Sequence, residues 1–447
     1  MTYIPHTDAD RRAMFDACGI KDLDDLFAVI PEKYRFPNLE LPHPLSELDV
    51  GRELQELSES NADVHRHPCF LGAGAYHHFI PSVVNHMIQR GEFMTAYTPY
   101  QPEVSQGTLQ TIFEYQSMIC ALTGMEVSNA SHYDGATSTA EAVIMAMNQF
   151  RGRRRKIIIS SRVHPEYRAV VRTYMQGTDL NIVEGENGQG DLDDSIAQLD
   201  EETAVFIMQQ PNFLGELEDM TGLANAVHDV GALLCVITNP IVLGILKPPG
   251  EYGADIVVGE GQPLGIPLSY GGPYLGFFAT REKYVRKMSG RLVGETVDKD
   301  GKRGYVMTLT PREQHIRRET ASSNICTNQG LMATAAAIYL SVMGKHGLRK
   351  VAELCYHRAH YAAQEIDSLG MYSVQNQQPF FHEFVLKCPK PVAEINSILF
   401  DDYGIIGGYD LSHDFSHLGH AMLIAITEMI TREEIDDFVS ALNDVAN

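Results

Sequence analysis

Residues 95–107 hold the densest group of side chains that could act on a ligand. The stretch reads TAYTPYQPEVSQG and carries phenol, carboxylate, hydroxyl and amide groups on Tyr97, Tyr100, Glu103, Ser105 and Gln106. Phenols and carboxylates can move a proton, and hydroxyls and amides can orient a polar ligand. Pro99 and Pro102 predict a loop that leads into a helix at 108–122. Such loops often face ligands, although a capped turn with packed tyrosine rings is the structural alternative.

Two adjacent histidines, His77 and His78, follow a glycine-rich turn at 71–76. Imidazole is a common metal ligand. Neighbouring residues on a strand or helix point in different directions, so an adjacent pair is a weak metal motif. We predict no metal here and expect both rings to be polar neighbours of a substrate.

Two hydroxyl-rich segments stand before predicted helices. One contains Tyr133, Asp134, Gly135 and Ala136 and leads to a helix at 140–148. The other, before a helix at 330–342, contains Ser322, Ser323, Asn324 and Thr327. Hydroxyls and backbone N–H groups at a helix start can hold a phosphate. Any capped helix looks similar, so each motif alone is weak.

The elements that must position these groups alternate regularly from residue 156 onward. Short apolar strands at 157–160, 180–183, 204–208 and 233–237 are separated by helices. This order predicts an α/β fold with a mostly parallel sheet covered on both faces. Sites in such sheets lie at the carboxyl ends of the strands. The sequence therefore places His164, Asn212, Asn239 and Gln262 along one rim.

Three domains are predicted. Residues 1–61 form an N-terminal arm that cannot bury its own apolar side chains, so we expect it to wrap around a partner. Residues 62–330 form the large α/β domain, and 331–447 form a smaller α+β domain. Within the large domain, residues 295–305 read as a polar loop.

The stretch 253–280 contains no lysine, although α/β folds of this kind often carry one there. In pyridoxal-phosphate (PLP) enzymes of the aminotransferase type, the turn after such a strand holds the Schiff-base lysine, and a carboxylate stands against the pyridine nitrogen. No lysine occurs between Lys247 and Lys283, and no acidic residue occurs from Val230 to Gly250. Gln262 stands at or next to the lysine position, and we expect Lys247 to be structural.

Composition limits the classes of partner and the cellular compartment that we expect for the protein. The 447 residues have a formal net charge of −23, which argues against nucleic acid and anionic membranes as partners. The seven cysteines are scattered without a Cys-x-x-Cys motif, as expected for free thiols in a reducing cytoplasm. The polar first residues predict no signal peptide.

Together these motifs resemble the glycine decarboxylase family, the P-protein of the glycine cleavage system, over essentially the whole chain. The resemblance is carried by TAYTPYQPEVSQG (95–107), YDGA (133–136), HPEYR (164–168), QPNFLG (210–215) and GADIVVG (253–259). It is closest to the split form of the family, in which an alpha subunit (subunit 1) keeps the fold without the lysine. It implies the PLP-dependent transferase (aminotransferase type I) fold.

The resemblance also implies the activity of glycine dehydrogenase (aminomethyl-transferring), an oxidoreductase. A beta subunit (subunit 2) carries PLP covalently, and two alpha–beta pairs commonly associate as a heterotetramer. The complex releases CO2 from glycine and transfers the aminomethyl group to lipoyl-lysine of the H-protein. Aminomethyltransferase (T-protein) and dihydrolipoyl dehydrogenase (L-protein) complete the system.

Residue roles follow from this resemblance. The side chains of 97–106 singled out above, with His77 and His78, would face the partner's PLP and glycine. Ser322, Ser323, Asn324 and Thr327 would reach the partner's phosphate. The cup at 133–136 would either be vestigial or be purely structural.

Two alternatives stay open at this point. The chain could be a non-catalytic scaffold that only stabilises the beta subunit. It could also be a self-sufficient PLP enzyme that uses an unusual lysine.

Overall fold

The computed structural model describes residues 5–185 and 190–446. The chain separates into two units, Met1–Ala62 and Asp63–Asn447.

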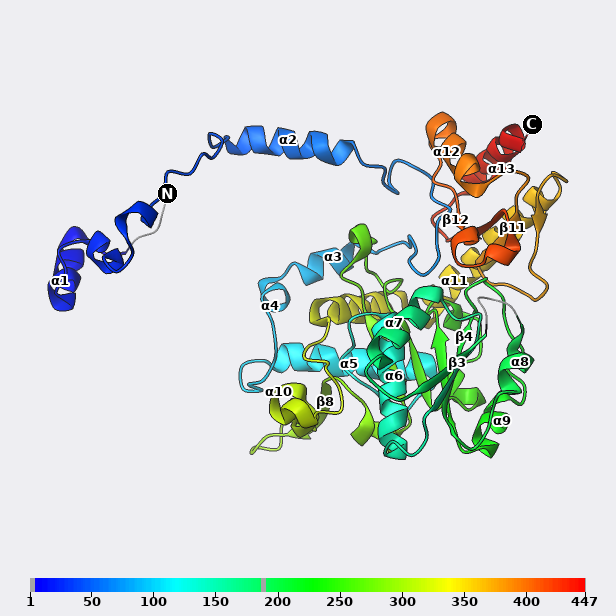
Figure 1. Ribbon diagram of the computed structural model, residues 1–447, viewed down its shortest axis with the longest axis horizontal. Coiled ribbons are helices and arrows are strands. Elements are labelled where there is room, and N and C mark those ends of the chain that lie inside the picture. The colour runs from blue at the N-terminus through cyan, green and yellow to red at the C-terminus, as the bar shows by residue number, and fades with distance from the viewer. Residues whose placement is uncertain (1–4, 186–189, 447) are drawn as a thin grey trace. The chain divides into compact units, whose positions relative to one another are not determined.

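The first unit consists of short helices joined by extended chain (Figure 1). Its elements are α1 (Asp8–Cys18), two 3-10 helices (Leu23–Phe27 and Glu32–Tyr34) and α2 (Glu47–Glu59). Thr7 and Ser46 cap α1 and α2 through their side chains, as is usual for hydroxyl residues before a helix. No residue between 5 and 62 is buried. The unit therefore has no apolar core of its own.

A seven-stranded sheet forms the centre of the second unit. Its strands are β1 (Val127–Ser128), β2 (Lys156–Ile159), β3 (Asn181–Glu184), β4 (Thr203–Gln210), β5 (Leu233–Thr238), β6 (Ile256–Glu260) and β7 (Gly276–Thr280), in the order β1-β7-β6-β5-β4-β2-β3. The five strands from β6 to β3 are parallel, and β7 is antiparallel to both of its neighbours, β6 and β1. The predicted, mostly parallel α/β sheet is confirmed.

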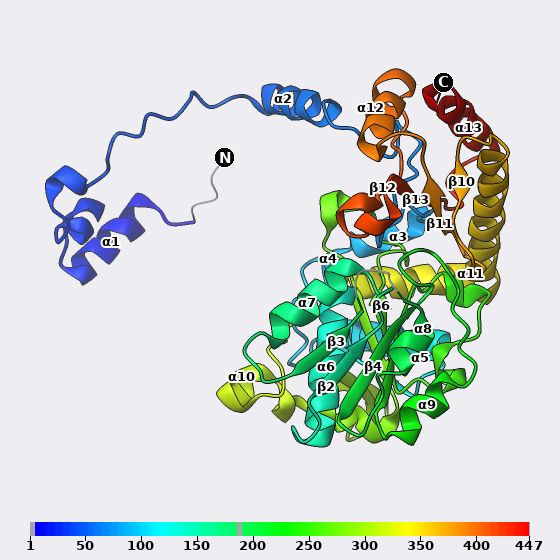
Figure 2. The same cartoon turned by 45° about the vertical axis from the view of Figure 1, so that its right-hand side comes forward.

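Helices cover both faces of this sheet (Figures 1 and 2). They include α5 (Gln106–Thr123), α6 (Gly135–Phe150), α7 (Pro165–Met175), α8 (Leu192–Ile196), α9 (Leu223–Asp229) and α11 (Gly330–Asp367). One core packs α6 and α7 on the sheet, and another packs α5, α9 and α11. Val205 and Ile207 of β4 belong to the first core, and Phe206 and Met208 belong to the second. This alternation explains why the strands are apolar throughout.

Three expectations about local structure need correction. The predicted polar loop at 295–305 is a hairpin of β8 (Leu292–Val297) and β9 (Arg303–Thr308). The side chain of Asp298 accepts backbone hydrogen bonds from Asp300 and Lys302, so the charged residues close a turn. Helix α6 starts five residues before the predicted position because Asp134 caps it. The helix predicted at 330–342 continues to Asp367 in α11, which is kinked at Gly344 (φ 56°).

The C-terminal part forms a four-stranded antiparallel sheet, ordered β10-β11-β13-β12, with helices against it. Its elements are β10 (Ser373–Val374), β11 (Glu383–Lys387), α12 (Val392–Tyr403), β12 (Tyr409–Asp410), β13 (Ala421–Ala425) and α13 (Arg432–Ala446). Short helices α3 (Ser82–Ile88), α4 (Gly91–Met94) and α10 (Gln314–Arg317) complete the second unit.

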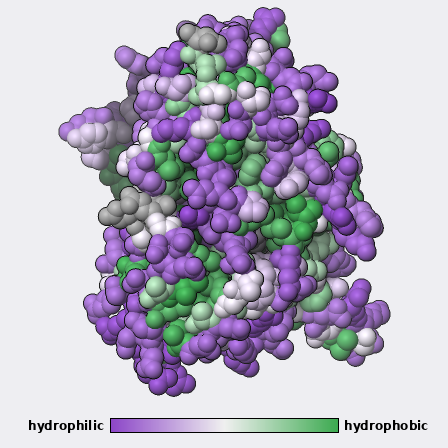
Figure 3. All heavy atoms as spheres, turned by 90° about the vertical axis from the view of Figure 1, so that its right-hand side faces the viewer, coloured by the Kyte–Doolittle hydropathy of each residue, from purple (hydrophilic) through white to green (hydrophobic). Residues whose placement is uncertain are grey.

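The surface and helices agree with the acidic, polar composition. One face of the molecule carries mostly hydrophilic side chains, and its apolar side chains lie in separate patches (Figure 3). Within the described ranges, no helix combines the length and apolar character needed to cross a bilayer. All seven cysteines are free thiols, and three of them are buried.

Candidate functional site

The loop after β6 holds Gln262 in a closed set of hydrogen bonds. Its side chain is buried, and its Oε1 accepts from the backbone N–H of Tyr76 at 2.9 Å. Its Nε2 donates to the carbonyls of Tyr76 (2.9 Å) and Ile266 (2.7 Å). The amide thus ties the loop to the segment that precedes α3. This arrangement offers no amine to a cofactor.

The predicted phosphate cup is filled by the chain itself. The backbone N–H of Gly135, at the start of α6, donates to Glu260 Oε2 at 3.0 Å. Glu260 Oε1 accepts from the backbone N–H groups of Gln262 (3.0 Å) and Leu275 (2.9 Å). Burial raises the pKa of Glu260 to about 8, although the three N–H donors favour the ionised form. A carboxyl group lies where a helix start would otherwise receive a phosphate.

Tyr167 closes the same cup from the side of α7. A Cβ atom on Gly135 would lie 2.2 Å from the Tyr167 hydroxyl, so the backbone and the phenol are in close approach. The Tyr167 ring stacks on His164, with centroids 4.9 Å apart. Burial lowers the pKa of His164, whose Nε2 lies 2.9 Å from the carbonyl of Ala73. With Glu260 and Tyr167 in place, these residues do not fit a bound PLP.

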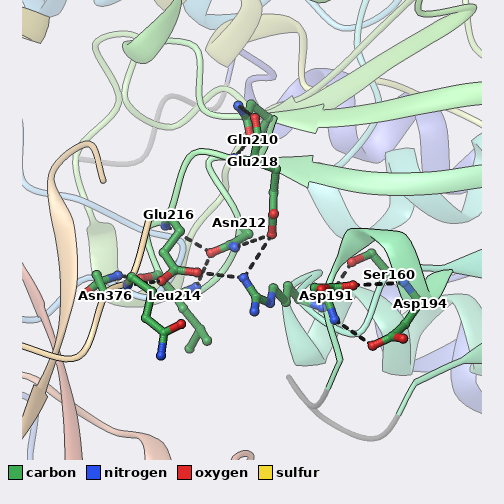
Figure 4. Close-up of polar contacts among 11 residues, drawn as sticks. Ser160, Asp191, Asp194, Gln210, Asn212, Leu214, Glu216, Glu218 and Asn376 are labelled. Atoms are coloured by element: carbon green, nitrogen blue, oxygen red, sulfur yellow. Dashed lines mark hydrogen bonds and ion pairs between the residues drawn. The ribbon is translucent and has the colours of Figure 1, made fainter. Parts of the chain in front are cut away.

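Asn212, which the sequence placed on the rim, folds its own loop (Figure 4). Its Nδ2 donates to Glu218 Oε1 at 2.7 Å, and its Oδ1 accepts from the N–H groups of Leu214 (3.0 Å) and Glu216 (3.1 Å). Asn239 likewise accepts from the N–H of Ile241 at 2.9 Å. The rim exists as predicted, because β2, β4, β5 and β6 are parallel. These two rim amides nevertheless make local contacts.

The tyrosine-rich loop lies at the surface. Tyr97 is 81% exposed and Tyr100 is 52% exposed, and Glu103 is also exposed. Ser105 is half-buried at the start of α5. Gln106 differs, because its amide pairs with the backbone of Tyr305 in β9 (2.9 Å in both directions). Tyr97, Tyr100, Glu103 and Gln106, four of the five predicted residues, are therefore exposed, and the Gln106 amide also anchors the loop to the hairpin.

The two histidines have different surroundings. His78 is buried, and its Nδ1 lies 2.7 Å from Glu428 Oε2. Cys355 donates to the same oxygen at 3.3 Å. A tetrahedral metal ion would hold nitrogen and oxygen ligands about 3.3 Å apart, so the His78–Glu428 distance is that of a hydrogen bond. His77 is half-buried, and burial, followed by the charge of His65, lowers its pKa. The burial of His78 argues against its predicted place beside the partner's substrate.

The segment 322–327 borders a shallow cavity lined by Ser322, Ser323 and Thr327 and by residues 288–291 and 312–314. Ser322 and Asn324 are exposed, whereas Ser323 and Thr327 are half-buried. The backbone N–H of Cys326 donates to the hydroxyl of Tyr133 at 3.2 Å. The segment 322–327 and the segment 133–136 are therefore neighbours in space, which their separation in the sequence did not reveal.

Arg291, which sequence reasoning missed, lies between the predicted segments. It immediately precedes β8 and is 6% exposed. Its guanidinium contacts Thr327, Asn328 and Cys326 and lies over the ring of Tyr100. A buried arginine beside a strand has no distinctive sequence pattern, so only the fold identifies it.

Lys247 stands apart from this region. It is exposed and borders a cavity of about 450 Å³ that Asp219, Asn225 and Tyr252 also line. Thr238, at the end of β5, reaches the same cavity and donates to the carbonyl of Gln210 at 2.8 Å. Among the residues that the structure describes, none forms a hydrogen bond or ion pair with Lys247 that would support the structural role expected for it.

Comparison with known proteins gives a consistent result. The family model described as "Glycine cleavage system P-protein" matches residues 1–442. The chain is 54% identical to "Probable glycine dehydrogenase (decarboxylating) subunit 1" of Thermomicrobium roseum, with 99% of both chains covered. It is 51% identical to the protein of the same name from Brevibacillus brevis, with 98% of both chains covered.

Solved structures extend this result to the fold. An inhibitor-bound glycine decarboxylase (P-protein) of the glycine cleavage system is 42% identical, with a TM-score of 0.90 and complete coverage of both chains. A sphingosine-1-phosphate lyase (13% identity, TM-score 0.65) and a glutamate decarboxylase (13%, 0.67) share only the fold. These similarities confirm the PLP-dependent transferase fold. The chain belongs to the glycine cleavage system P-protein family.

Proposed function

We propose that this chain is the PLP-free alpha subunit of a split glycine decarboxylase and completes the active site of a PLP-bearing beta subunit. The complex releases CO2 from glycine and transfers the aminomethyl group to lipoyl-lysine of the H-protein. PLP on the partner holds the electrons left by decarboxylation. The observation that carries the proposal is the Glu260 carboxylate on the N–H of Gly135, in a chain whose adjacent loop has no lysine.

The exposed loop supplies the groups that act across the interface. Tyr97, Tyr100 and Glu103 orient glycine and hold or move a proton beside it. Support comes from their exposure, since each can be reached by another chain. Phenol and carboxylate groups are also the usual carriers of protons in active sites.

Ser322, Ser323, Asn324 and Thr327 supply donors to the partner's phosphate. Support comes from a cavity that Ser322, Ser323 and Thr327 line together with Arg291, Arg312 and Glu313. Two guanidinium groups against one carboxylate leave a net positive charge, and cationic groups with hydroxyls favour an anion. This local setting contrasts with the net charge of −23 on the whole chain.

The N-terminal unit packs on the beta subunit. Support comes from its composition, because large apolar side chains are exposed along it; these are Leu23, Leu26, Phe27, Val29, Ile30, Tyr34, Phe36, Leu39, Leu41, Leu45, Leu48, Val50, Leu54 and Leu57. Apolar surface of this extent marks an interaction site.

Absorbance and borohydride reduction of the purified chain with added PLP, with and without the beta subunit, test the proposal. We expect no reducible adduct on this chain, and decarboxylation of glycine only when the beta subunit is present. A reduced PLP adduct on a lysine of this chain would overturn the proposal. Lys247 is the lysine to inspect first, because its amine borders the 450 Å³ cavity.

A further inference from the structure

We propose that Arg291 is a positioning residue that holds the tyrosine loop (95–107) and the serine segment (322–327) in one arrangement. The inference rests on the proposed function, which gives these two segments their roles across the interface. Arg291 itself contacts neither substrate nor cofactor in this scheme. It acts through Tyr100 and Thr327.

The first contact set fixes the serine segment. Nη1 of Arg291 donates to Thr327 Oγ1 and to Asn328 Oδ1, each at 3.0 Å. Nη2 donates to the carbonyl of Cys326 at 3.0 Å. Three consecutive residues are therefore bound by one planar guanidinium, whose fork fixes direction as well as distance.

The second contact reaches the tyrosine loop. The guanidinium carbon of Arg291 lies 5.8 Å from the ring centroid of Tyr100, within the range of a cation–π interaction. Tyr100 also contacts His315, whose ring centroid is 5.8 Å away. Tyr100 is held by these two contacts and is still half exposed. Arg291 thus sets the orientation of a side chain that faces outward.

The backbone around Arg291 is itself fixed. Its carbonyl accepts from the N–H of Ala130 at 2.8 Å, and Asn328 Nδ2 donates to the carbonyl of Ala130 at 2.9 Å. Gln106 binds Tyr305 of the same hairpin. The β8–β9 hairpin is therefore a common support, and Arg291 is the side chain through which both segments meet.

The hydrogen bonds of the guanidinium are directed at the serine segment. Glu313 Oε2 lies 3.8 Å from Nε of Arg291, which is beyond hydrogen-bond distance. Nε is buried and has no hydrogen-bond partner among the described residues. The nearby carboxylate balances charge, while orientation comes from the contacts with Thr327, Asn328 and Cys326.

Arg291→Lys in the reconstituted alpha–beta complex tests the inference. A lysine keeps the charge but cannot bind three acceptors in one plane. We expect assembly to be retained, kcat for CO2 release from carboxyl-labelled glycine to fall about 10- to 100-fold, and the partner's PLP absorbance band to shift. Lipoylated H-protein is the acceptor in the assay.

Arg154→Lys is the matched control. Arg154 also bridges two segments, donating to the carbonyls of Thr203 (2.8 Å) and Val230 (2.9 Å), and lies 4.7 Å from the ring centroid of Phe150. It precedes β2, at the end of the sheet opposite the carboxyl-end rim. We expect Arg154→Lys to lower thermal stability without changing kcat, KM or the PLP band.

A second variant keeps the inference testable if Arg291→Lys does not assemble. Asn328→Ala removes one acceptor of the guanidinium and the hydrogen bond to the carbonyl of Ala130, and it leaves the side chains of Arg291, Tyr100 and Thr327 chemically unchanged. We expect it to lower kcat about three-fold or more with the same spectral shift. An assembled Arg291→Lys or Asn328→Ala complex that behaves like Arg154→Lys would overturn the inference. Failure of the unmodified complex to decarboxylate glycine would instead overturn the proposed function.

Discussion

The carboxylate of Glu260 accepts a hydrogen bond from the backbone N–H of Gly135 at 3.0 Å. The bond joins the end of β6 to the start of α6, two elements 125 residues apart in sequence. A helix start is a ready anion site, and here a carboxyl group of the same chain occupies it. The cofactor cleft of the fold is therefore closed from within.

The first prediction concerns the pH dependence of stability. The pKa of Glu260 is about 8 in the folded chain, against an ordinary 4.5. Between these values the folded chain keeps a proton that the unfolded chain has released, so the free energy of unfolding falls as the pH rises from 4.5 to 8. Glu260→Gln should make the free energy of unfolding fall less steeply with pH. The change in slope should correspond to at most one bound proton, as measured by chemical denaturation from pH 5 to 8.5.

The control for Glu260→Gln is Glu201→Gln, which makes the same change from carboxyl to amide at an exposed position. It should leave the slope unchanged. Glu141 and Glu383, whose pKa values burial raises to about 7, should preserve part of the slope in both variants. Equal slopes for Glu260→Gln and the unmodified chain would contradict the first prediction.

The second prediction concerns the tyrosine loop. Tyr97→Phe and Glu103→Gln in the alpha–beta complex should each lower kcat at least about ten-fold, because each removes a group that can hold or move a proton. Assembly, followed by analytical ultracentrifugation, should not change. Val104→Ala, a 79% exposed position of the same loop, is the control. Unchanged turnover in both variants would favour the scaffold alternative.

A third prediction concerns the glutamine after β6. Gln262→Lys should not produce a borohydride-reducible PLP adduct, because Glu260 and Tyr167 still fill the cup. It should also lower the free energy of unfolding by about 1–3 kcal/mol, since Tyr76 and Ile266 lose hydrogen-bond partners. Absorbance and denaturant titration measure the two effects. Gln262→Glu, which introduces no amine, controls for disruption of the loop. A yellow, reducible Gln262→Lys chain would mean that the cleft is still open to PLP.

The fourth prediction concerns the N-terminal unit. Deletion of residues 1–62 should leave a folded chain, because the second unit has its own apolar cores. The deletion should weaken association with the beta subunit at least about ten-fold, as measured by ultracentrifugation. Leu39→Ser with Leu41→Ser, at two exposed positions, should weaken it in the same direction. Undiminished association of both variants would show that the beta subunit binds elsewhere.

The sheet could be predicted from the sequence because the evidence for each strand lies within a few consecutive residues. Continuous apolar runs such as 204–208 mark buried parallel strands. The hairpin at 292–308 was missed because its charged turn, closed by Asp298, resembles a solvent-exposed loop. The boundary between the two units, after Ala62, is also marked locally, because no residue from 5 to 62 is buried.

The site was harder to predict because its contacts are distant in sequence. The exposed positions of Tyr97 and Glu103 agree with a polar loop, but the same reasoning placed His78 there too. His78 instead meets Glu428, 350 residues away. The closure of the cup depends on Glu260, which in the sequence is only the last residue of an apolar strand. Arg291 becomes informative only when Tyr100 and Thr327 are brought together around it.

Under the proposed function, the Glu260–Gly135 contact also predicts a stoichiometry. Two subunits of one fold would ordinarily offer two cofactor sites per pair, and each would compete for the same vitamin-derived molecule. With one cleft closed by a side chain, a pair of this chain and the proposed PLP-bearing partner should saturate at one equivalent of cofactor. Titration of the pair with PLP should then show a single break, because no cofactor should be held on the subunit that cannot use it.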